Sequence, residues 1–215
     1  MNPKYYEPLE QMMAVRHQYM AKMISSHNES NIYNFFIKRE ILDLGCGTGK
    51  FLHNYFELGS FCTGVDAANN FQIRNKKNYK LVKSNFDTFV KKNKKKYDVI
   101  FIFEFLEHLS FKDREFLFKN MSNILKKNGF VFLSTINKNI IAEFMSINIA
   151  EKLFKLLPQN THDPKLFLKP SDIQILSEKN NLKLLNIQGI SYNPLLKNFK
   201  LSKIDLVNYF ATISC

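Results

Sequence analysis

The chain has 215 residues, of which 45% are hydrophobic and 23% charged, enough apolar material for one well-packed domain and too little length for two large ones. Its three cysteines, Cys46, Cys62 and Cys215, exclude a disulfide scaffold and a four-cysteine zinc site, and they favour a reducing compartment. The first residues lack the pattern of a secretion signal or an organellar presequence, and no stretch approaches the apolar length of a membrane-spanning helix.

The net charge is +12, because 31 Lys and Arg residues oppose 19 Asp and Glu residues. A positive field of this size attracts nucleic acid, anionic lipid or acidic substrates, and the charge alone does not choose among them. The lysines within residues 91–96 also fit an ordinary solvated loop.

In chain order, a helix is expected over residues 5–27, followed by short runs of β-forming residues that alternate with helical patterns. Strands are predicted at residues 41–44, 61–65, 80–83, 98–102 and 130–134, and helices at 50–58, 68–75, 112–125 and 140–157. Two further strands, at 182–188 and 206–213, flank a loop that contains Asn193 and Pro194. The pattern predicts a single α/β domain over residues 1–215, with a mainly parallel sheet that an antiparallel pair closes.

The strongest local signal is the segment 41–49, ILDLGCGTG, a buried strand that runs into a glycine turn. Gly45, Gly47 and Gly49 allow positive φ and let a ligand approach the backbone. The spacing is G-x-G-x-G, which does not by itself predict a pyrophosphate cradle. Asp66 ends the next strand, so we expect its carboxylate beside a ligand on the turn, where it can accept both hydroxyls of a ribose.

An acidic cluster, with Glu104, Glu107 and His108, follows the fourth predicted strand. On a turn that enters a helix the three side chains could converge on a hard divalent cation, and oxygen-rich ligation favours magnesium. Such a cation lowers the pKa of a phenol and orients its oxygen as a nucleophile. Two alternatives stay open: His108 takes the proton itself, or Glu104 only caps a helix whose first turn is polar.

The glycine turn that Asp43 opens, with an acid closing the second strand, resembles the S-adenosylmethionine site of class I methyltransferases. The resemblance implies a Rossmann-like fold whose mainly parallel seven-stranded sheet has an antiparallel C-terminal strand pair and helices on both faces. It places Asp43, Gly45 and Gly47 in the cofactor site, with the glycines against the methionine half, and Asp66 on the ribose. Near the adenine it implies one of the residues 84–86, of which we choose Asn85.

Three later segments narrow the resemblance to the ubiquinone-biosynthesis O-methyltransferases, and the likeness runs from about residue 8 to residue 209. They are Thr161-His162-Asp163 with Phe167, Lys169 and Pro170, then Tyr192-Asn193-Pro194, and finally Val207-Asn208-Tyr209. The family O-methylates polyprenylated catechols and hydroxyphenols, which implies two steps, 3-demethylubiquinol to ubiquinol and 2-polyprenyl-6-hydroxyphenol to 2-polyprenyl-6-methoxyphenol. The alternatives are an RNA methyltransferase and a non-catalytic lipid-binding subunit with the same fold.

The same resemblance implies roles for single residues. Arg16 binds the carboxylate of the cofactor, a task suited to a two-pronged guanidinium, although it also reads as a surface charge on a helix. Phe103 stands where the family offers a methionine to the cofactor. Glu104, Glu107 and His108 match the magnesium ligands of the family, and we take Glu107 and His108 as the catalytic residues.

Residues 138–170 are expected to form a lid or a membrane-contact insertion. The predicted helix at 140–157 has an apolar stripe flanked by lysines, which fits either an anionic membrane surface or a lid packed on the core. The expected partners are a polyprenyl phenol or catechol, an anionic membrane surface and other enzymes of the pathway, with no nucleic acid. The expected place is the inner face of the bacterial cytoplasmic membrane, or the matrix side in a mitochondrion.

Overall fold

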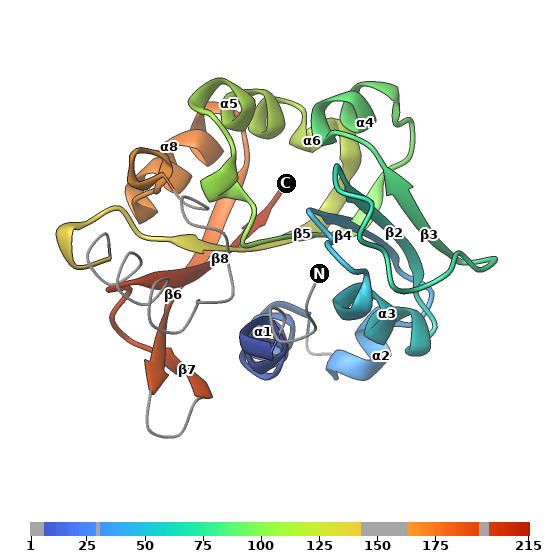
Figure 1. Ribbon diagram of the computed structural model, residues 1–215, viewed down its shortest axis with the longest axis horizontal. Coiled ribbons are helices and arrows are strands. Elements are labelled where there is room, and N and C mark those ends of the chain that lie inside the picture. Colours follow the sequence, from blue (N-terminus) through green and yellow to red (C-terminus); the bar gives the residue numbers. More distant parts are fainter. Residues whose placement is uncertain (1–6, 29–30, 143–162, 194–197) are drawn as a thin grey trace.

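The computed structural model describes residues 7–28, 31–142, 163–193 and 198–215. Five parallel strands form the first part of its sheet: β1 (Glu40–Leu44), β2 (Phe61–Asp66), β3 (Tyr79–Lys83), β4 (Tyr97–Phe103) and β5 (Leu125–Ile136). Three antiparallel strands continue it: β6 (Lys183–Asn193), β7 (Asn198–Ser202) and β8 (Asn208–Ser214). Within the described residues the order is β3-β2-β1-β4-β5-β8-β6-β7 (Figure 1). The predicted α/β fold is confirmed, with eight strands in place of seven.

Helices cover both faces of the sheet, as expected (Figure 1). On one face lie α1 (Glu7–Asn28), α2 (Ile32–Phe36) and α3 (Lys50–Glu57), and on the other α4 (Phe86–Lys92), α5 (Phe111–Lys119), α6 (Met121–Ile124) and α8 (Pro170–Lys179). Two short 3-10 helices, η2 (Leu106–His108) and η3 (Pro164–Leu166), lie between them in the chain. Each face has its own apolar core, since β4 and β5 are buried on both sides.

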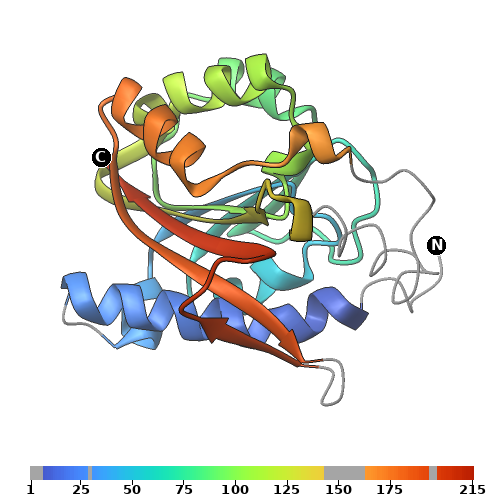
Figure 2. The same ribbon diagram turned by 90° about the vertical axis from the view of Figure 1, so that its left-hand side faces the viewer.

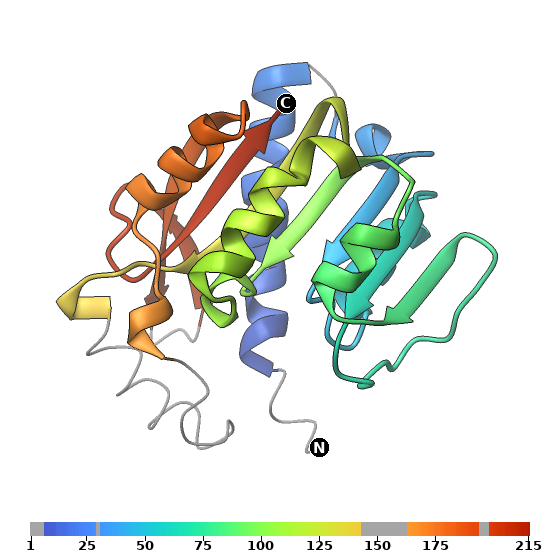
Figure 3. The same ribbon diagram turned by 90° about the horizontal axis from the view of Figure 1, so that it is seen from above.

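The long helix α1 confirms the helix predicted over residues 5–27 in its described part, and it crosses the strands on one side of the sheet (Figures 2 and 3). Its inner face is buried at steps of three or four residues, with Met12, Val15, Tyr19 and Met23 each no more than 5% exposed. The Tyr19 ring stacks on Phe210, with 4.8 Å between the centroids, and this contact joins the N-terminal helix to a C-terminal strand.

The helix predicted at residues 68–75 is wrong, because the structure has a loop there. Its backbone amides bond to groups outside any helix: Ala68 N donates to Asp66 Oδ1 at 2.8 Å, and Gln72 N donates to the Thr48 carbonyl at 3.0 Å. These bonds hold the loop against the glycine turn and take the donors that a helix would need.

Other expected elements differ in their bounds. The helix expected at 112–125 is split into α5 and α6 at Asn120, whose side chain donates to the Phe116 carbonyl at 2.8 Å. Four elements were not predicted from the sequence: α2, α4, α8 and β7, which pairs antiparallel with β6. Of the helix expected at 140–157, and of the insertion expected at 138–170, residues 143–162 lie outside the described residues. None of the helices that the structure describes has the length and apolarity needed to cross a bilayer.

Candidate functional site

A cavity opens where β1 and β4 end, between the glycine turn, α1 and α3. Six of its lining residues are among the residues singled out in the sequence: Arg16, Asp43, Gly45, Gly47, Phe103 and Glu104. The carboxyl ends of neighbouring parallel strands are where open α/β sheets bind their ligands. The structure thus brings together most of the predicted cofactor site, although the segments that supply it lie almost 90 residues apart in the chain.

The glycine turn has the backbone that its composition predicts. Gly45, Gly47 and Gly49 have φ angles of +78°, +54° and +82°, a region that L-residues seldom adopt. A Cβ on Gly45 would lie 2.6 Å from the Phe105 ring, whereas a Cβ on Gly47 would meet nothing within 4 Å. Gly45 is therefore required by packing, and Gly47 leaves open space in the wall of the cavity.

Asp66 lies at the end of β2 and holds the turn through its side chain. Its Oδ2 accepts from Gly47 N at 2.9 Å and its Oδ1 accepts from Ala68 N at 2.8 Å. Each oxygen keeps a lone pair for a further donor, so the carboxylate can still serve a ligand hydroxyl. Asn85 precedes α4 and is exposed, and neither Asn85 nor Asp66 lines the cavity. Ser84 N donates to the Asp66 carbonyl, which places the 84–85 segment next to Asp66.

Arg16 projects from α1 into the cavity and is 6% exposed, which corrects the alternative of a surface charge. Its guanidinium carbon lies 4.8 Å from the Phe103 ring centroid and 5.3 Å from that of Phe51. Burial lowers the pKa of Arg16, while the Glu104 and Asp43 carboxyls oppose that shift. The Nε atom is buried and has no hydrogen-bond partner in the described part of the chain. Such a group fits an anionic ligand that enters the cavity.

Asp43 shares the cavity wall with Arg16 and is 4% exposed. Burial raises the pKa of Asp43 to about 7; Arg16 counteracts this shift and Asp66 adds to it. The carboxyl therefore changes its charge near neutral pH, at the point where the predicted cofactor would present its charged methionine end.

Two carboxyl groups follow β4. Glu104 lines the cavity, has a φ of +49°, and accepts from the Ser134 hydroxyl through Oε1 at 2.6 Å. Glu107 is 1% exposed and accepts from the Thr135 hydroxyl through Oε2 at 2.9 Å, while its Oε1 has no hydrogen-bond partner among the described residues. Burial and the neighbouring Glu104 carboxyl raise the pKa of Glu107 well above its ordinary value. A buried carboxyl with one unpartnered oxygen, beside a second carboxyl, is typical of a functional site.

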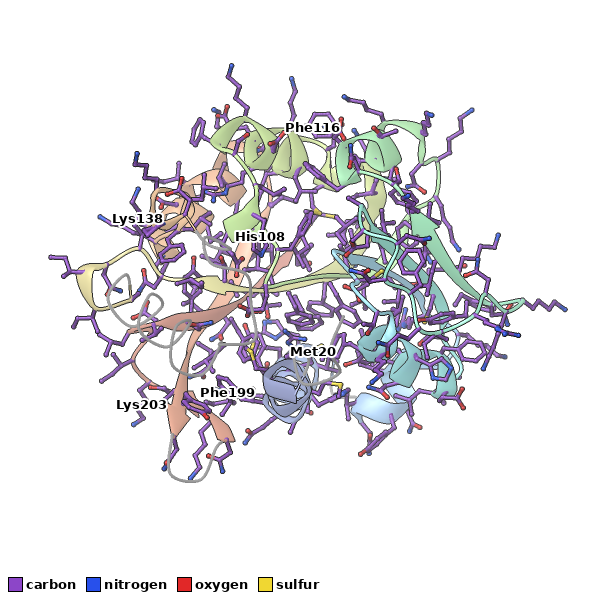
Figure 4. All side chains as sticks on the ribbon, viewed as in Figure 1. Met20, His108, Phe116, Lys138, Phe199 and Lys203 are labelled. Carbon is purple, nitrogen blue, oxygen red and sulfur yellow. The ribbon has the colours of Figure 1, made fainter. Side chains whose placement is uncertain are left out.

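His108 closes the turn after Glu107 and is exposed, on the side of the sheet opposite Met20 of α1 (Figure 4). Partial burial of the imidazole lowers the pKa of His108, and Glu104 opposes this shift. Within the described ranges, no three or more His, Cys, Asp or Glu side chains form a group that could hold a metal ion. Glu104, Glu107 and His108 thus do not form such a group in the described chain: Glu107 is buried, Glu104 is half-buried and His108 is exposed.

Several residues that the sequence reading did not single out complete the site. Met13 from α1, and Lys50 and Phe51 from α3, line the cavity beside Cys46 and Thr48 of the turn. Phe51 follows the glycine turn directly, and its place at the start of a helix was the available signal. Ser134 and Thr135, which hold the two carboxyls, lie near the end of an apolar strand, where nothing local marks a hydroxyl as functional.

A comparison of two glycines tests the cavity wall. Gly47→Ala puts a methyl group into open space at a positive φ, so we expect a stability loss of about 1 kcal/mol and a fall of about tenfold or more in affinity for S-adenosylhomocysteine. Gly59→Ala is the control, since Gly59 also has a positive φ (+90°), faces open space and lies outside the cavity lining. Chemical unfolding and calorimetry measure both quantities, and equal losses of affinity in the two variants would contradict this assignment.

Comparison with known proteins gives the family. The model of a methyltransferase domain matches residues 13–187. The ubiquinone biosynthesis O-methyltransferase of Pelagibacter ubique (strain HTCC1062) is 34% identical over 214 residues, covering 95% of this chain and 87% of the relative. The enzyme of the same name from Coxiella burnetii (strain RSA 331 / Henzerling II) is 32% identical, covering 95% and 85%.

Solved structures show the same fold. The plantazolicin methyltransferase in complex with a substrate analogue and S-adenosylhomocysteine has a TM-score of 0.67 at 15% identity, covering 98% of this chain and 87% of the other. Magnesium protoporphyrin IX methyltransferase from Synechocystis PCC 6803, with bound S-adenosylhomocysteine, has a TM-score of 0.61 at 13% identity, covering 95% and 83%. With the relatives above, these likenesses confirm the predicted Rossmann-like fold and the methyl donor. The chain belongs to the ubiquinone biosynthesis O-methyltransferases, and S-adenosylmethionine is its methyl donor.

Proposed function

We propose that the protein O-methylates polyprenylated phenols, converting 3-demethylubiquinol to ubiquinol and 2-polyprenyl-6-hydroxyphenol to 2-polyprenyl-6-methoxyphenol. The observation that carries the proposal is the carboxyl pair beside the cofactor cavity, with Glu104 in its wall and Glu107 buried next to it. An acceptor oxygen must lose its proton as it takes the methyl group, so a methyltransferase that acts on a phenol needs acidic or basic groups at this place.

The cofactor is held, in this proposal, by residues from five parts of the fold: α1, the glycine turn, the end of β2, the residue before α4 and the end of β4. Arg16 binds its carboxylate through the buried guanidinium, and Gly45 and Gly47 lie against the methionine half. Asp66 accepts the ribose hydroxyls, and Asn85 lies near the adenine. Phe103 packs on the donor end, where its ring also contacts Arg16. Alignment of the sulfonium with the acceptor oxygen supplies much of the rate, a contribution of roughly 7–11 kcal/mol in favourable systems.

The proposal also includes a magnesium ion bound at the Glu104 and Glu107 carboxyls. The unpartnered Oε1 of Glu107 and the adjacent Glu104 carboxyl fit a hard cation, and magnesium commonly takes only one or two protein carboxylates together with oxygens of the substrate. When bound there, the ion would lower the pKa of the acceptor phenol. His108, at the exposed edge of the same turn, would receive the proton that leaves.

We further propose that the protein docks on the anionic inner surface of the membrane that holds its substrate. Ile140 and Ile141 are 84% and 48% exposed, and Ile204 and Leu206 are 66% and 43% exposed. The two pairs are neighbours, because Asn139 Nδ2 donates to the Leu206 carbonyl at 2.8 Å. Lys138 and Lys203 lie at the same end of the sheet as this patch (Figure 4). Aliphatic side chains flanked by lysines favour an anionic interface.

One assay tests the function against its rivals. The protein is incubated with labelled S-adenosylmethionine and magnesium, beside a short-chain polyprenyl catechol and beside total RNA. Label in the catechol supports the proposal, and label in RNA alone would replace it with an RNA methyltransferase. Label in neither acceptor would favour a non-catalytic binding protein. Sedimentation with vesicles of anionic or neutral lipid tests the membrane contact separately.

Removal of the metal ion tests its role separately. Chelation is expected to reduce turnover by about a hundredfold or more while affinity for S-adenosylhomocysteine stays unchanged, because the carboxyl pair and not the cofactor cavity holds the ion. Glu107→Gln, of nearly equal volume, should give the same split and abolish any response to added magnesium. Full activity in chelator would remove the metal and leave His108 as the proton acceptor.

A further inference from the structure

Two adjacent hydroxyls near the end of β5 each bond to one of the two carboxyls. The Ser134 hydroxyl donates to Glu104 Oε1 at 2.6 Å, and the Thr135 hydroxyl donates to Glu107 Oε2 at 2.9 Å. Both hydroxyl residues are fully buried. Two consecutive residues of β5 therefore hold two carboxyls that lie next to each other, since the Glu104 carboxyl is the neighbour that raises the pKa of Glu107.

The backbone at this point is fixed as well. Glu104 has a positive φ of +49°, which costs an ordinary side chain about 1 kcal/mol or more. Its amide donates to the Ser134 carbonyl at 3.1 Å, so the residue is tied to β5 through main chain and side chain together. Strain that is held in place by two bonds to one residue indicates that the direction of this carboxyl matters.

Glu107 depends still more on its one hydroxyl. The Thr135 bond occupies Oε2, whereas Oε1 has no hydrogen-bond partner among the residues described. A rigid buried donor on one oxygen determines where the other oxygen points. Without it, the carboxyl of this 1% exposed glutamate would keep only its contacts with its own amide and with Glu104, and its direction would change.

From this geometry we propose that Ser134 and Thr135 are positioning residues for methyl transfer, which fix the directions of the Glu104 and Glu107 carboxyls toward the acceptor. The role rests on the proposed O-methylation, since it acts through the two glutamates. It differs from a role in folding because each hydroxyl donates its proton to a carboxyl, and the backbone amide that Ser134 Oγ accepts from, at 3.3 Å, is that of Glu104 itself. It requires no contact of either hydroxyl with the cofactor, and neither residue lines the cofactor cavity.

The test removes one hydroxyl and leaves the shape of the side chain. Thr135→Val is expected to lower kcat by about tenfold or more, because the buried Glu107 carboxyl loses a hydrogen bond that fixes its direction, with affinity for S-adenosylhomocysteine unchanged. Thr135→Ser restores the hydroxyl and should recover most of kcat. The matched control is Thr212→Val. Thr212 is also fully buried, but its hydroxyl pairs with the Tyr19 hydroxyl at 2.7 Å and not with a carboxyl, so kcat should stay near that of the wild type.

Ser134→Ala gives the corresponding test for Glu104, with Ser177→Ala as its control. Ser177 is buried to the same degree, and its hydroxyl donates to the Ile173 carbonyl of its own helix at 2.8 Å. We expect kcat to fall in Ser134→Ala and to stay unchanged in Ser177→Ala.

Crystal structures of the wild type and Thr135→Val provide a readout that needs no substrate. The Glu107 carboxyl is expected to rotate in the variant. If the wild type methylated no catechol, the proposed function would fail, and the position of Glu107 would still decide whether Thr135 directs it. An unmoved Glu107 overturns the inference, and so does a kcat that falls equally in Thr135→Val and Thr212→Val or that Thr135→Ser does not recover.

Discussion

Asp66→Ala is expected to weaken binding of S-adenosylhomocysteine by about a hundredfold, which corresponds to roughly 2.7 kcal/mol. The substitution removes the proposed acceptor of the ribose hydroxyls and also frees the amides of Gly47 and Ala68, which both donate to this carboxylate. Hydrogen bonds to a charged group are each worth more than those between neutral groups, so the losses reinforce one another. Calorimetric titration measures the affinity, and circular dichroism checks that the fold is kept.

Asp87→Ala is the control for the change of charge. Asp87 lies in α4, where its carboxylate pairs with Lys91 at 3.1 Å, whereas that of Asp66 accepts from the glycine turn. Its removal should leave the affinity for S-adenosylhomocysteine within about twofold of the wild type, since a surface pair contributes little beyond its own neighbourhood. An equal loss in both variants would mean that net charge, and not the Asp66 contacts, attracts the cofactor product.

The parts of the site that could be predicted from the sequence are those with a local signal. The glycine turn was predicted because three glycines at alternate positions after a buried strand indicate positive φ, and the structure has it at each of them. Asp66 could be placed because it ends a predicted strand, and the carboxyl ends of parallel strands lie at the edge of the sheet where ligands bind. Burial of Arg16 could not be derived in this way, since it depends on α1 packing over β4 and α3, which are distant in sequence.

What the sequence reading missed depends on long-range partners. The loop at 68–75 has apolar residues at helical spacing, but its amides bond to Asp66 and Thr48. Both acceptors lie outside the segment, so its own sequence does not predict these bonds. The strand β7 is short and only partly buried, and its pairing with β6 makes it a strand. The predicted metal ligands remain a prediction: spacing placed Glu104, Glu107 and His108 together, and the turn buries Glu107 and exposes His108, which depends on packing that spacing does not reveal.

Asp43→Asn should change how stability depends on pH. Burial raises the pKa of Asp43 to about 7 in the folded protein, from 3.8, so between these values the folded chain holds a proton that the unfolded chain has lost. The free energy of unfolding of the wild type therefore falls as pH rises from about 4 to about 7. Asparagine does not titrate. The free energy of unfolding of the variant should therefore rise relative to that of the wild type over this window, by an amount on the order of 2–4 kcal/mol. Urea unfolding without cofactor at pH 5 and pH 8 measures it.

Asp98→Asn should show the opposite slope and so serves as the control. Burial disfavours the charge of Asp98, but bonds from Lys126 at 2.8 Å and from Glu40 N at 2.9 Å outweigh it, and the pKa is lowered. This carboxylate stabilises the fold above its unfolded pKa, and the contribution is lost as pH falls through the folded value. Asp98→Asn is thus expected to be less stable than the wild type at neutral pH, by a margin that narrows in acid. If the difference in free energy of unfolding between Asp43→Asn and the wild type were the same at every pH, the pKa of Asp43 would not be raised by burial, and this assignment would be wrong.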